Sequence, residues 1–589
     1  MSKRDLILRG GNIVDVSAVK VSPGDLVIRN GVIDGIYTPG EVPGGDGFTE
    51  IDIPGRYVAP GFIDGHLHIE SSMLSPLEFT RAAVRCGTTT IFVDPHEIAN
   101  VFGRKGVELF LEQARILPLD MYIGIPSCVP ATNLEDSGGE IGIEDIKELL
   151  PDGRVYGLAE MMNFPGVINK VPEVCGKVEL AYQFGKVVDG HCPGLSGEDL
   201  AKYISNGAGD KVVRIMSDHE INSGEEAVEK YRAGMWVMVR EGSASKNLEE
   251  VLSYLVKSEC PLDRSVLVSD DRDPVDLEER GHMEWTVNKA RDIILKNSGL
   301  SKEEAAIRAI GLATLNTARY FRREEIGEVA VGKKGNLVVF RSLDDIRAER
   351  VISNGVVVAR EGEFVGEALQ CDYSGYLSSV NIGREITASD LRISYAGEEE
   401  TPEVKVIGII PDSIVTQKLL VPLKASGGPG DRELKAATDK DILKIAVFER
   451  HKATGKYAVG FVKGMGIGKG AVASTVSHDS HNLMVIGADD EMMAEATNYL
   501  SAQGGGIVAM DGKRTEYLPL QIGGLMSTGD IKSVAGRHKS LARFIRDMGS
   551  RLESPFLTMS FLALPVIPEL RLTDRGLVDV NKFGFVELY

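Results

Sequence analysis

Hydrophobic and polar positions alternate in a regular way between about Gly61 and Asp271. Eight short apolar runs each end in a polar or charged residue, and helical patterns such as VELFLEQARIL follow several of them. Alternating strand and helix segments predict parallel strands joined by crossover helices. The predicted strands end near His68, His96, Ser127, Glu160, His191, His219, Glu241 and Asp270. Since eight parallel strands close a barrel, the pattern predicts a (β/α)8 TIM-like barrel over residues 59–318.

The segments on either side of this region show a strand-like period of two. LILRGGNIV and GDLVIRNGVI lie before the barrel, and GNLVVFRS and ERVISNGVVVAR lie after it. Such runs with glycine-rich turns are typical of short antiparallel strands. They predict one composite β-sandwich domain built from residues 1–58 and 319–375. The remaining residues, 380–589, alternate apolar runs with the helical segment DEMMAEATNYL and predict a separate C-terminal α/β domain.

Three predicted helix starts carry the pattern of a capping box. They are Ser223 with Glu226, Asn247 with Glu250, and Ser301 with Glu304. In such a box the first side chain accepts a backbone hydrogen bond from the third helical residue, whose side chain reaches back. We therefore expect a helix to begin at each of these positions.

Metal-ligating residue types gather at the predicted strand ends. The set is His66, His68, Glu160, His191, His219 and Asp270. Histidines at positions i and i+2 of a strand project from the same face, so His66 and His68 are expected to bind one cation together. A single histidine is more simply a core residue, but six such residues at successive strand ends predict a metal site. In a barrel the active site lies at the carboxyl ends of the strands.

The residue types also restrict the metal chemistry. Histidine and carboxylate ligands without thiolate suit divalent Zn, Mn or Fe. We assign His66, His68 and Asp270 to one cation and His191 and His219 to the other, with Glu160 as the bridge. Two ions sharing a water lower its pKa and generate hydroxide, so the pattern predicts a hydrolase.

Composition excludes several classes of partner. The chain has 589 residues, 43% hydrophobic residues, a net charge of -20 and a pI near 5.1, which argue against nucleic acid or an anionic membrane as partner. No apolar run approaches the ~18 residues of a membrane span, and the first residues show no apolar leader segment. The six cysteines include no C-x-x-C, which fits a reducing, cytoplasmic location and excludes a cysteine-ligated zinc deaminase.

Several longer motifs resemble a known family. VAPGFIDGHLH, HCPG, SDHE and VGKKGNLVVF are similar to sequences of the amidohydrolase superfamily. More narrowly, HLHIESSMLSPLEF, DPHEIAN, GLAEMMNFPGV, SDDRDP and SHDSHNLMVIG resemble the adenine deaminases of that superfamily, over nearly the whole chain. Many superfamily members bridge two metals with a modified lysine, whereas this chain offers Glu160 at that place. Glu160 argues against the dihydroorotase and hydantoinase branches.

The resemblance implies the hydrolytic deamination of adenine to hypoxanthine and ammonia, a step of purine salvage. Metal-activated hydroxide would attack C6 at a centre of two divalent cations per subunit, with Mn²⁺ or Fe²⁺ favoured over Zn²⁺. The partners would then be adenine and water, with no nucleic acid or membrane, and a homo-oligomer, a dimer or higher, is expected. Two alternatives stay open: another amidohydrolase that acts on a cyclic amide or N-acyl substrate, and a catalytically inactive scaffold.

The predicted reaction requires acids and bases beside the metal ligands. Asp270 is the candidate proton shuttle, and His96, Glu97 and Glu220 are candidates to face the pocket and assist N1. Candidate substrate-binding residues are Glu70, Ser71 and Asp94. Each has a structural alternative, since Glu70 could stabilise its own loop, Asp94 could cap a turn before Pro95, and Ser71 or Ser72 could cap a helix. We expect Asp271 to point to the opposite face of its strand.

One group of candidate residues lies outside the predicted barrel. His478, Asp479 and His481 fall within four positions, just before the apolar run LMVIG. They could form a lid over the barrel mouth or an additional metal site. The alternative is a polar loop that stabilises the C-terminal domain. We favour contact with the active site.

Overall fold

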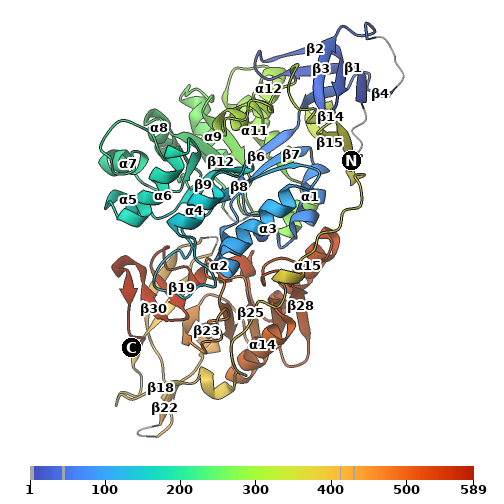
Figure 1. Cartoon of the computed structure of the whole chain (residues 1–589). Helices are drawn as coiled ribbons and strands as arrows, with labels where there is room; N and C mark the ends of the chain where they lie inside the picture. Colours follow the sequence, from blue (N-terminus) through green and yellow to red (C-terminus); the bar gives the residue numbers. More distant parts are fainter. Residues whose placement is uncertain (1–4, 43–46, 244, 412, 429–430) are drawn as a thin grey trace.

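In the computed structural model, the structure describes residues 5–42, 47–243, 245–411, 413–428 and 431–589. The chain is arranged in three parts along one long direction, with the N-terminal strands at one end and the C-terminal sheet at the other (Figure 1). The first four residues, part of the stretch without a leader pattern, lie outside the described ranges. Within those ranges, no helix has both the length and the apolar character needed to cross a bilayer.

Parallel strands form the middle part. One sheet has the order β10-β9-β8-β7-β6 and a second has the order β11-β12-β13. Their bounds are β6 Phe62–Leu67, β7 Thr88–Val93, β8 Asp120–Ile125, β9 Val155–Met161, β10 Val187–Gly190, β11 Ser217–Asp218, β12 Trp236–Arg240 and β13 Ser265–Val268. Almost every residue of these strands is buried, as expected where helices cover a parallel sheet.

Backbone hydrogen bonds link the two parallel sheets at both joins. The N–H of Asp270 donates to the carbonyl of His66 at 2.9 Å, and the N–H of Met216 donates to Val188 at 2.9 Å. The prediction of parallel strands with crossover helices is therefore confirmed in this coarser form, as two curved sheets with a separate sheet domain after them.

Helices follow most of these strands along the chain. Their bounds are α1 Pro76–Val84, α2 His96–Phe102, α3 Arg104–Ala114, α4 Ile143–Leu149, α5 Phe164–Ile168, α6 Pro172–Gln183, α7 Gly197–Ile204, α8 Gly224–Arg232, α9 Leu248–Lys257, α10 Pro274–Glu279, α11 Met283–Asn297, α12 Lys302–Leu312 and α13 Leu315–Tyr320. The capping box of Ser301 and Glu304 is confirmed.

The other two predicted boxes are corrected. Ser223 accepts from the N–H of Glu226, but the Glu226 carboxylate accepts from Asn222 and Gly194 instead of reaching back to Ser223. Asn247 makes no cap hydrogen bond; its side chain binds the backbone of neighbouring strand ends, including the carbonyl of His219 at 3.0 Å. Tertiary contacts thus displace the local capping pattern.

The N-terminal part is a nine-stranded sheet that contains strands from both flanks of residues 59–318, which are predicted to form a barrel and are called the barrel region below. Its order is β17-β16-β15-β14-β5-β1-β2-β3, with β4 paired to β1. The bounds are β1 Asp5–Asp15, β2 Lys20–Arg29, β3 Val32–Tyr37, β4 Phe48–Asp52, β5 Tyr57–Pro60, β14 Leu337–Ser342, β15 Asp345–Ser353, β16 Val356–Arg360 and β17 Glu363–Phe364. Strand β5 lies between β1, its parallel neighbour, and β14, its antiparallel neighbour.

The C-terminal part is built on an eight-stranded sheet of order β20-β19-β24-β23-β26-β25-β27-β28. All neighbours are antiparallel except β19 and β24. The bounds are β19 Glu403–Ile409, β20 Thr416–Pro422, β23 Ile442–Phe448, β24 Tyr457–Lys463, β25 Ala471–Ser474, β26 Leu483–Gly487, β27 Gly506–Met510 and β28 Thr515–Pro519, with helices α14 Asp490–Gln503, α15 Ile531–Asp547 and α16 Pro555–Ser560.

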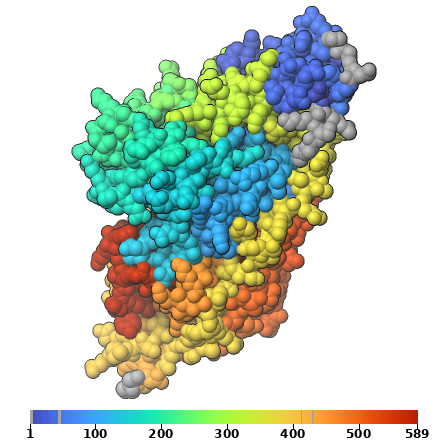
Figure 2. All heavy atoms as spheres, viewed as in Figure 1, coloured from blue at the N-terminus to red at the C-terminus, as the bar shows by residue number. Residues whose placement is uncertain are grey.

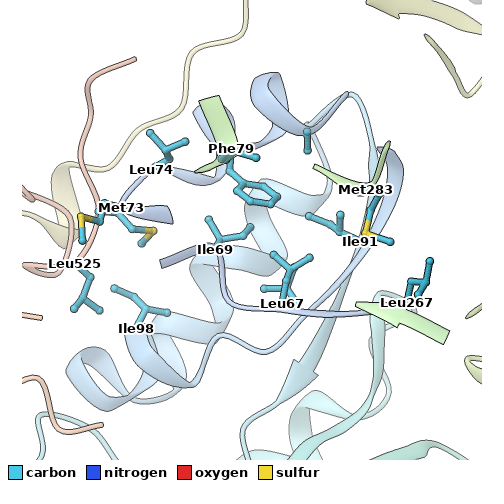
Figure 3. Packing of buried hydrophobic residues seen from close by; sticks show 14 of the residues in the cluster. Leu67, Ile69, Met73, Leu74, Phe79, Ile91, Ile98, Leu267, Met283 and Leu525 are labelled. Atoms are coloured by element: carbon cyan, nitrogen blue, oxygen red, sulfur yellow. The ribbon is translucent and has the colours of Figure 1, made fainter. Parts of the chain in front are cut away.

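The C-terminal part docks directly on the barrel region. The two parts share a broad boundary (Figure 2). The N–H of Ser527 donates to Met73 at 2.8 Å, and the N–H of Ser75 donates back to Ser527 at 3.2 Å. Leu525 packs beside Met73 and Ile98 of the barrel region (Figure 3). This contact places the C-terminal part beside the strand ends that carry the candidate ligands.

Candidate metal centre and active site

Glu160 lies near the end of β9 among four histidines. Its Oε1 is 3.6 Å from Nε2 of His68 and 3.5 Å from Nδ1 of His96. Its Oε2 is 2.7 Å from Nδ1 of His191 and 3.2 Å from Nε2 of His219. The Glu160 side chain is only 4% exposed, so one buried carboxylate is shared by imidazoles from four different strand ends.

His66 and Asp270 complete the same cluster. The ring of His66 stacks on His219 with centroids 4.2 Å apart and lies 4.9 Å from the ring of His68. Oδ1 of Asp270 is 3.3 Å from Nε2 of His68. The structure therefore brings together all six side chains that the sequence analysis selected as ligands.

Several buried atoms of the cluster make no hydrogen bond within the described residues. These atoms are both ring nitrogens of His66, Nδ1 of His219, Nδ1 of His96 and both carboxylate oxygens of Asp94. Buried polar groups normally have a partner, and each exception requires an explanation. Imidazole and carboxylate donors of this kind are the ligands that divalent transition metals bind. The residues present therefore fit a metal centre.

The structure adds two residues to the cluster. Donor atoms of His68, Asp94, His96 and Glu160 lie within 4.8 Å of one another. The sequence analysis placed His96 among the catalytic candidates and Asp94 among the substrate-binding ones. Asp94 and His96 follow the second predicted strand, just as the other ligands follow theirs. This position is the signal that would have placed them in the ligand group.

Burial and neighbouring charges shift the pKa values of the clustered side chains. Burial, together with the rings of His219 and His68, holds the pKa of His66 well below its usual value. His66 is thus neutral, which is the form that binds metals. Although burial alone would raise it, His219 and His191 hold the pKa of the Glu160 carboxyl well below its usual range. Glu160 is therefore an anion inside the protein.

Arg240, at the end of β12, was not among the predicted site residues. It is 4% exposed and pairs with Oδ2 of Asp270 and with Glu220, whose Oε2 lies 2.9 Å from Nη2. Burial opposes ionisation of Asp270, but Arg240 and the hydrogen bond with His68 hold its pKa well below the usual range. Arg240 thus fixes Oδ2 of Asp270 and leaves Oδ1 facing His68.

Replacing Arg240 with methionine is expected to lower the free energy of unfolding by about 3–5 kcal/mol, because Asp270 and Glu220 would lose their buried cation. Urea unfolding measures this loss. The matched control is Lys296→Met, since the exposed pair of Lys296 and Glu249 is expected to contribute below about 1 kcal/mol. An Arg240→Met protein as stable as the control would contradict the assignment of a buried pair.

A cavity of about 400 Å³ opens between the barrel region and the C-terminal part. Its polar lining includes Glu70, Ser71, Glu97, Asp271, His478 and His481, and its apolar lining includes Met73, Val275, Val476, Ile507, Leu525 and Phe556. A cavity with an apolar wall and a few polar groups is the usual form of a small-molecule site. Both halves of the chain therefore line the candidate substrate site.

Ser71 and Ser72 of the first βα loop do not cap a helix. Ser71 donates to Oδ1 of Asp271 at 2.5 Å, and Ser72 donates to the carbonyl of Ile69 at 2.6 Å. The cap of α1 is Ser75, which accepts from the backbone N–H of Glu78 at 3.3 Å.

Asp271 lines the cavity, so the expectation that it points to the opposite face of its strand is wrong. The reason is that the chain bends at Asp270, whose φ is 54°.

Glu70 presents a free oxygen at this cavity. Its Oε1 accepts from the N–H of Ile98 at 3.1 Å, while its Oε2 makes no hydrogen bond within the described part of the chain. Burial raises the pKa of Glu70 to about 7. Glu70 therefore both stabilises a loop and offers an oxygen to a ligand, so the two readings of this residue are compatible.

His478, Asp479 and His481 are buried and reach the barrel region. Nδ1 of His478 is 2.6 Å from Oε1 of Glu97, and Nε2 of His481 contacts Oε2 of Glu97. Asp479 is buried as well, and burial raises its pKa to about 6. The segment before β26 thus lies against the first turn of α2, as contact with the active site requires.

Comparison with known proteins gives two family matches. Residues 57–358 match the Amidohydrolase family and residues 413–584 match the Adenine deaminase C-terminal domain. The chain is 40% identical over 586 residues to an adenine deaminase of Desulfatibacillum aliphaticivorans, covering 99% of this chain and 97% of the relative. It is 42% identical over 583 residues to an adenine deaminase of Brucella suis biovar 1 (strain 1330), covering 99% and 94%.

A solved structure of a beta-aspartyl dipeptidase from Fervidobacterium islandicum AW-1 aligns with 63% of this chain and 100% of that chain, with a TM-score of 0.47 and 14% identity.

The chain matches the Amidohydrolase family over half its length. Its parallel strands carry a cluster of histidines and carboxylates at their ends. These features together define an amidohydrolase. Within that class, 40% identity over 99% of the chain and the C-terminal domain match establish that the chain belongs to the adenine deaminase family. The membership expected from the sequence motifs is confirmed.

Proposed function

We propose that this chain hydrolyses adenine to hypoxanthine and ammonia at the cluster around Glu160. The observation that carries the proposal is the convergence of four histidines on one buried glutamate, with His66 and Asp270 beside it. The relatives with about 40% identity over nearly the full length are named adenine deaminase, which supports adenine as the substrate.

The ligand set would hold two divalent cations. His66, His68 and Asp270 would hold one, His191 and His219 the other, and Glu160 both, with His96 and Asp94 available on the side of His68. When bound, such cations lower the pKa of water and so supply hydroxide at neutral pH. This nitrogen and oxygen set suits divalent Mn, Fe or Zn, and the resemblance to the adenine deaminases favours Mn²⁺ or Fe²⁺ over Zn²⁺.

Asp270 is the proton carrier of the proposed reaction. Attack of water oxygen on C6 releases a proton, and loss of the amine from C6 consumes one. A carboxylate near both atoms can accept the first and deliver it to the leaving amine. Because Arg240 holds Oδ2 of Asp270, Oδ1, which lies 3.3 Å from Nε2 of His68 at the cluster, is the oxygen that would take this role.

The cavity beside the cluster would hold the base. Apolar side chains such as Met73 and Phe556 would pack on the faces of the purine, and the free Oε2 of Glu70 would meet a polar edge. Glu97 is held as an anion: burial raises its pKa, but His478 and His481 hold it well below the usual range. Glu97 therefore suits the role of acceptor and not of acid toward N1.

We also infer that the two parallel sheets close into one eight-stranded barrel, supported by the backbone hydrogen bonds at both joins. The domain limits 1–58 with 319–375, 59–318 and 380–589 remain predictions, as do the cytoplasmic location and the homo-oligomer. The nine-stranded sheet, which takes strands from both flanks, supports the composite first domain.

The proposed function is tested by combining elemental analysis with a coupled ammonia assay on adenine. We expect roughly two Mn or Fe ions per chain and one ammonia per hypoxanthine formed, because two cations activate the attacking water. Removal of the ions with a chelator should abolish turnover, and readdition of Mn²⁺ should restore it. A metal-loaded protein that leaves adenine intact but opens a cyclic amide would overturn the proposal in favour of the other amidohydrolase class.

A further inference from the structure

Glu97 of the barrel region contacts two histidines of the C-terminal part beside the candidate active site. It lies in the first turn of α2, directly after His96, and its side chain is 3% exposed. Helix α2 lies at the boundary between the two parts (Figure 1). Both oxygens of Glu97 are met by histidines from the segment before β26, Oε1 by His478 and Oε2 by His481.

The hydrogen-bond pattern determines the tautomer of His481. The backbone N–H of Ser477 donates to Nδ1 of His481 at 3.2 Å, so Nδ1 carries no hydrogen. In a neutral imidazole the other nitrogen is then the N–H donor. Nε2 of His481 therefore donates to Oε2 of Glu97.

This tautomer separates two interpretations of the group. Donor atoms of Glu97, His478 and His481 lie within 4.8 Å of one another, which by distance alone would suit a third cation. A cation bound to Nε2 of His481 would require Nε2 to lose its hydrogen. Because Nδ1 carries no hydrogen and accepts a hydrogen bond from the N–H of Ser477, the ring would then have no hydrogen on either nitrogen. A hydrogen-bonded carboxylate explains the contacts without that cost.

The backbone and rings of both histidines are fixed from the C-terminal side. The His478 ring stacks on Phe561 with centroids 4.6 Å apart, and its backbone N–H donates to Ser560 at 2.9 Å. The carbonyl of His481 accepts from the buried guanidinium of Arg450. Neither imidazole needs to reorganise to hold Glu97.

We propose that His478 and His481 are positioning residues that hold Glu97 as a hydrogen-bond acceptor for an N–H of the substrate, so that the C-terminal domain completes the active site. A carboxylate has about four acceptor sites. His478 and His481 occupy two of them, and Nε2 of His96 lies 3.4 Å from Oε1, which leaves room for a further donor. Glu97 lines the cavity together with Glu70 and Asp271. This inference rests on the proposed function, because it assumes that adenine binds in this cavity.

The first test compares two replacements of His481. His481→Leu removes the N–H donor and is expected to lower kcat/KM for adenine by about 10–100-fold, mainly through a higher KM, since a misplaced contact of about 1 Å costs up to roughly 100-fold. His481→Gln keeps an N–H donor of similar reach and is expected to restore activity to within about threefold of the wild type. The metal content should equal that of the wild type in both variants.

The second test asks whether His481 acts through Glu97. In a double-mutant cycle, His481→Leu should lower kcat/KM far less in a Glu97→Ala protein than in the wild type. The matched control is His451→Leu, because His451 contacts the carbonyl of Ser480 in the same segment but not Glu97. Its effect is expected to be equal in both backgrounds.

The outcomes separate this inference from the proposed function. Wild-type protein that releases no ammonia from adenine overturns the proposed function. Active wild-type protein in which His481→Leu is as active as wild type, or lowers kcat/KM equally with and without Glu97, overturns the positioning role. His478→Leu, tested in the same cycle, gives the same decision if the His481→Leu protein fails to fold.

Discussion

Glu160→Gln is expected to lower adenine turnover by about 10²–10⁴-fold and to lose at least one bound cation. One oxygen of the Glu160 carboxylate faces His68 and His96, and the other faces His191 and His219. A neutral amide at this position would therefore remove the negative charge that all four imidazoles face. Removing one member of a buried ionic cluster costs about 3–5 kcal/mol, which corresponds to a rate or affinity factor of that size.

Elemental analysis of the Glu160→Gln protein, beside its rate on adenine, measures both effects. Glu241→Gln is the matched control, because Glu241 is also a buried carboxylate after a parallel strand but pairs with Lys289 at 2.6 Å, away from the histidines. We expect the control to keep its metal. A Glu160→Gln protein that retains both ions would remove Glu160 from the bridging role.

Asp270→Asn is expected to lower kcat by about 10²–10⁴-fold, the range that proton transfer by a positioned group contributes. An amide keeps the shape of the side chain and can still accept from Arg240, but it cannot carry a proton from water to the amine. The contacts of Asp270 with His68 and Arg240 place it for that transfer.

Steady-state rates of Asp270→Asn, corrected for metal content, measure the loss. Asp271→Asn serves as the matched control, since this neighbouring carboxylate lines the cavity and accepts from Ser71. It is expected to raise KM more than it lowers kcat. If Asp270→Asn kept kcat within tenfold of the wild type after this correction, the proton would have another carrier.

The six selected ligands could be proposed from the sequence because they lie at the ends of five apolar runs, with His66 and His68 sharing the first run. A parallel sheet brings the carboxyl ends of its strands to one side, so residues far apart in the chain become neighbours without knowledge of any loop. The same reasoning explains why β9 and its Glu160 were identified correctly as a strand and its end.

Other features depend on contacts that a local pattern does not contain. Arg240 ends an apolar run, where an arginine is normally expected at the surface. Only the fold shows that Asp270 and Glu220 surround it. Asn247 has the sequence of a helix cap, yet it binds the backbone of His219. The partner of His478 and His481 is Glu97, more than three hundred residues earlier, so their function could be suspected but not assigned.

The position of β5 within the nine-stranded sheet has a consequence for synthesis of the chain. Residues 57–60 pair with β1 on one side, but their other neighbour is β14, residues 337–342. While the ribosome is still translating the parallel strands, β5 has an unpaired edge, which is the kind of surface that invites wrong pairing. The nine-stranded sheet therefore cannot be completed until β14 has been synthesised, and incomplete chains expose this edge.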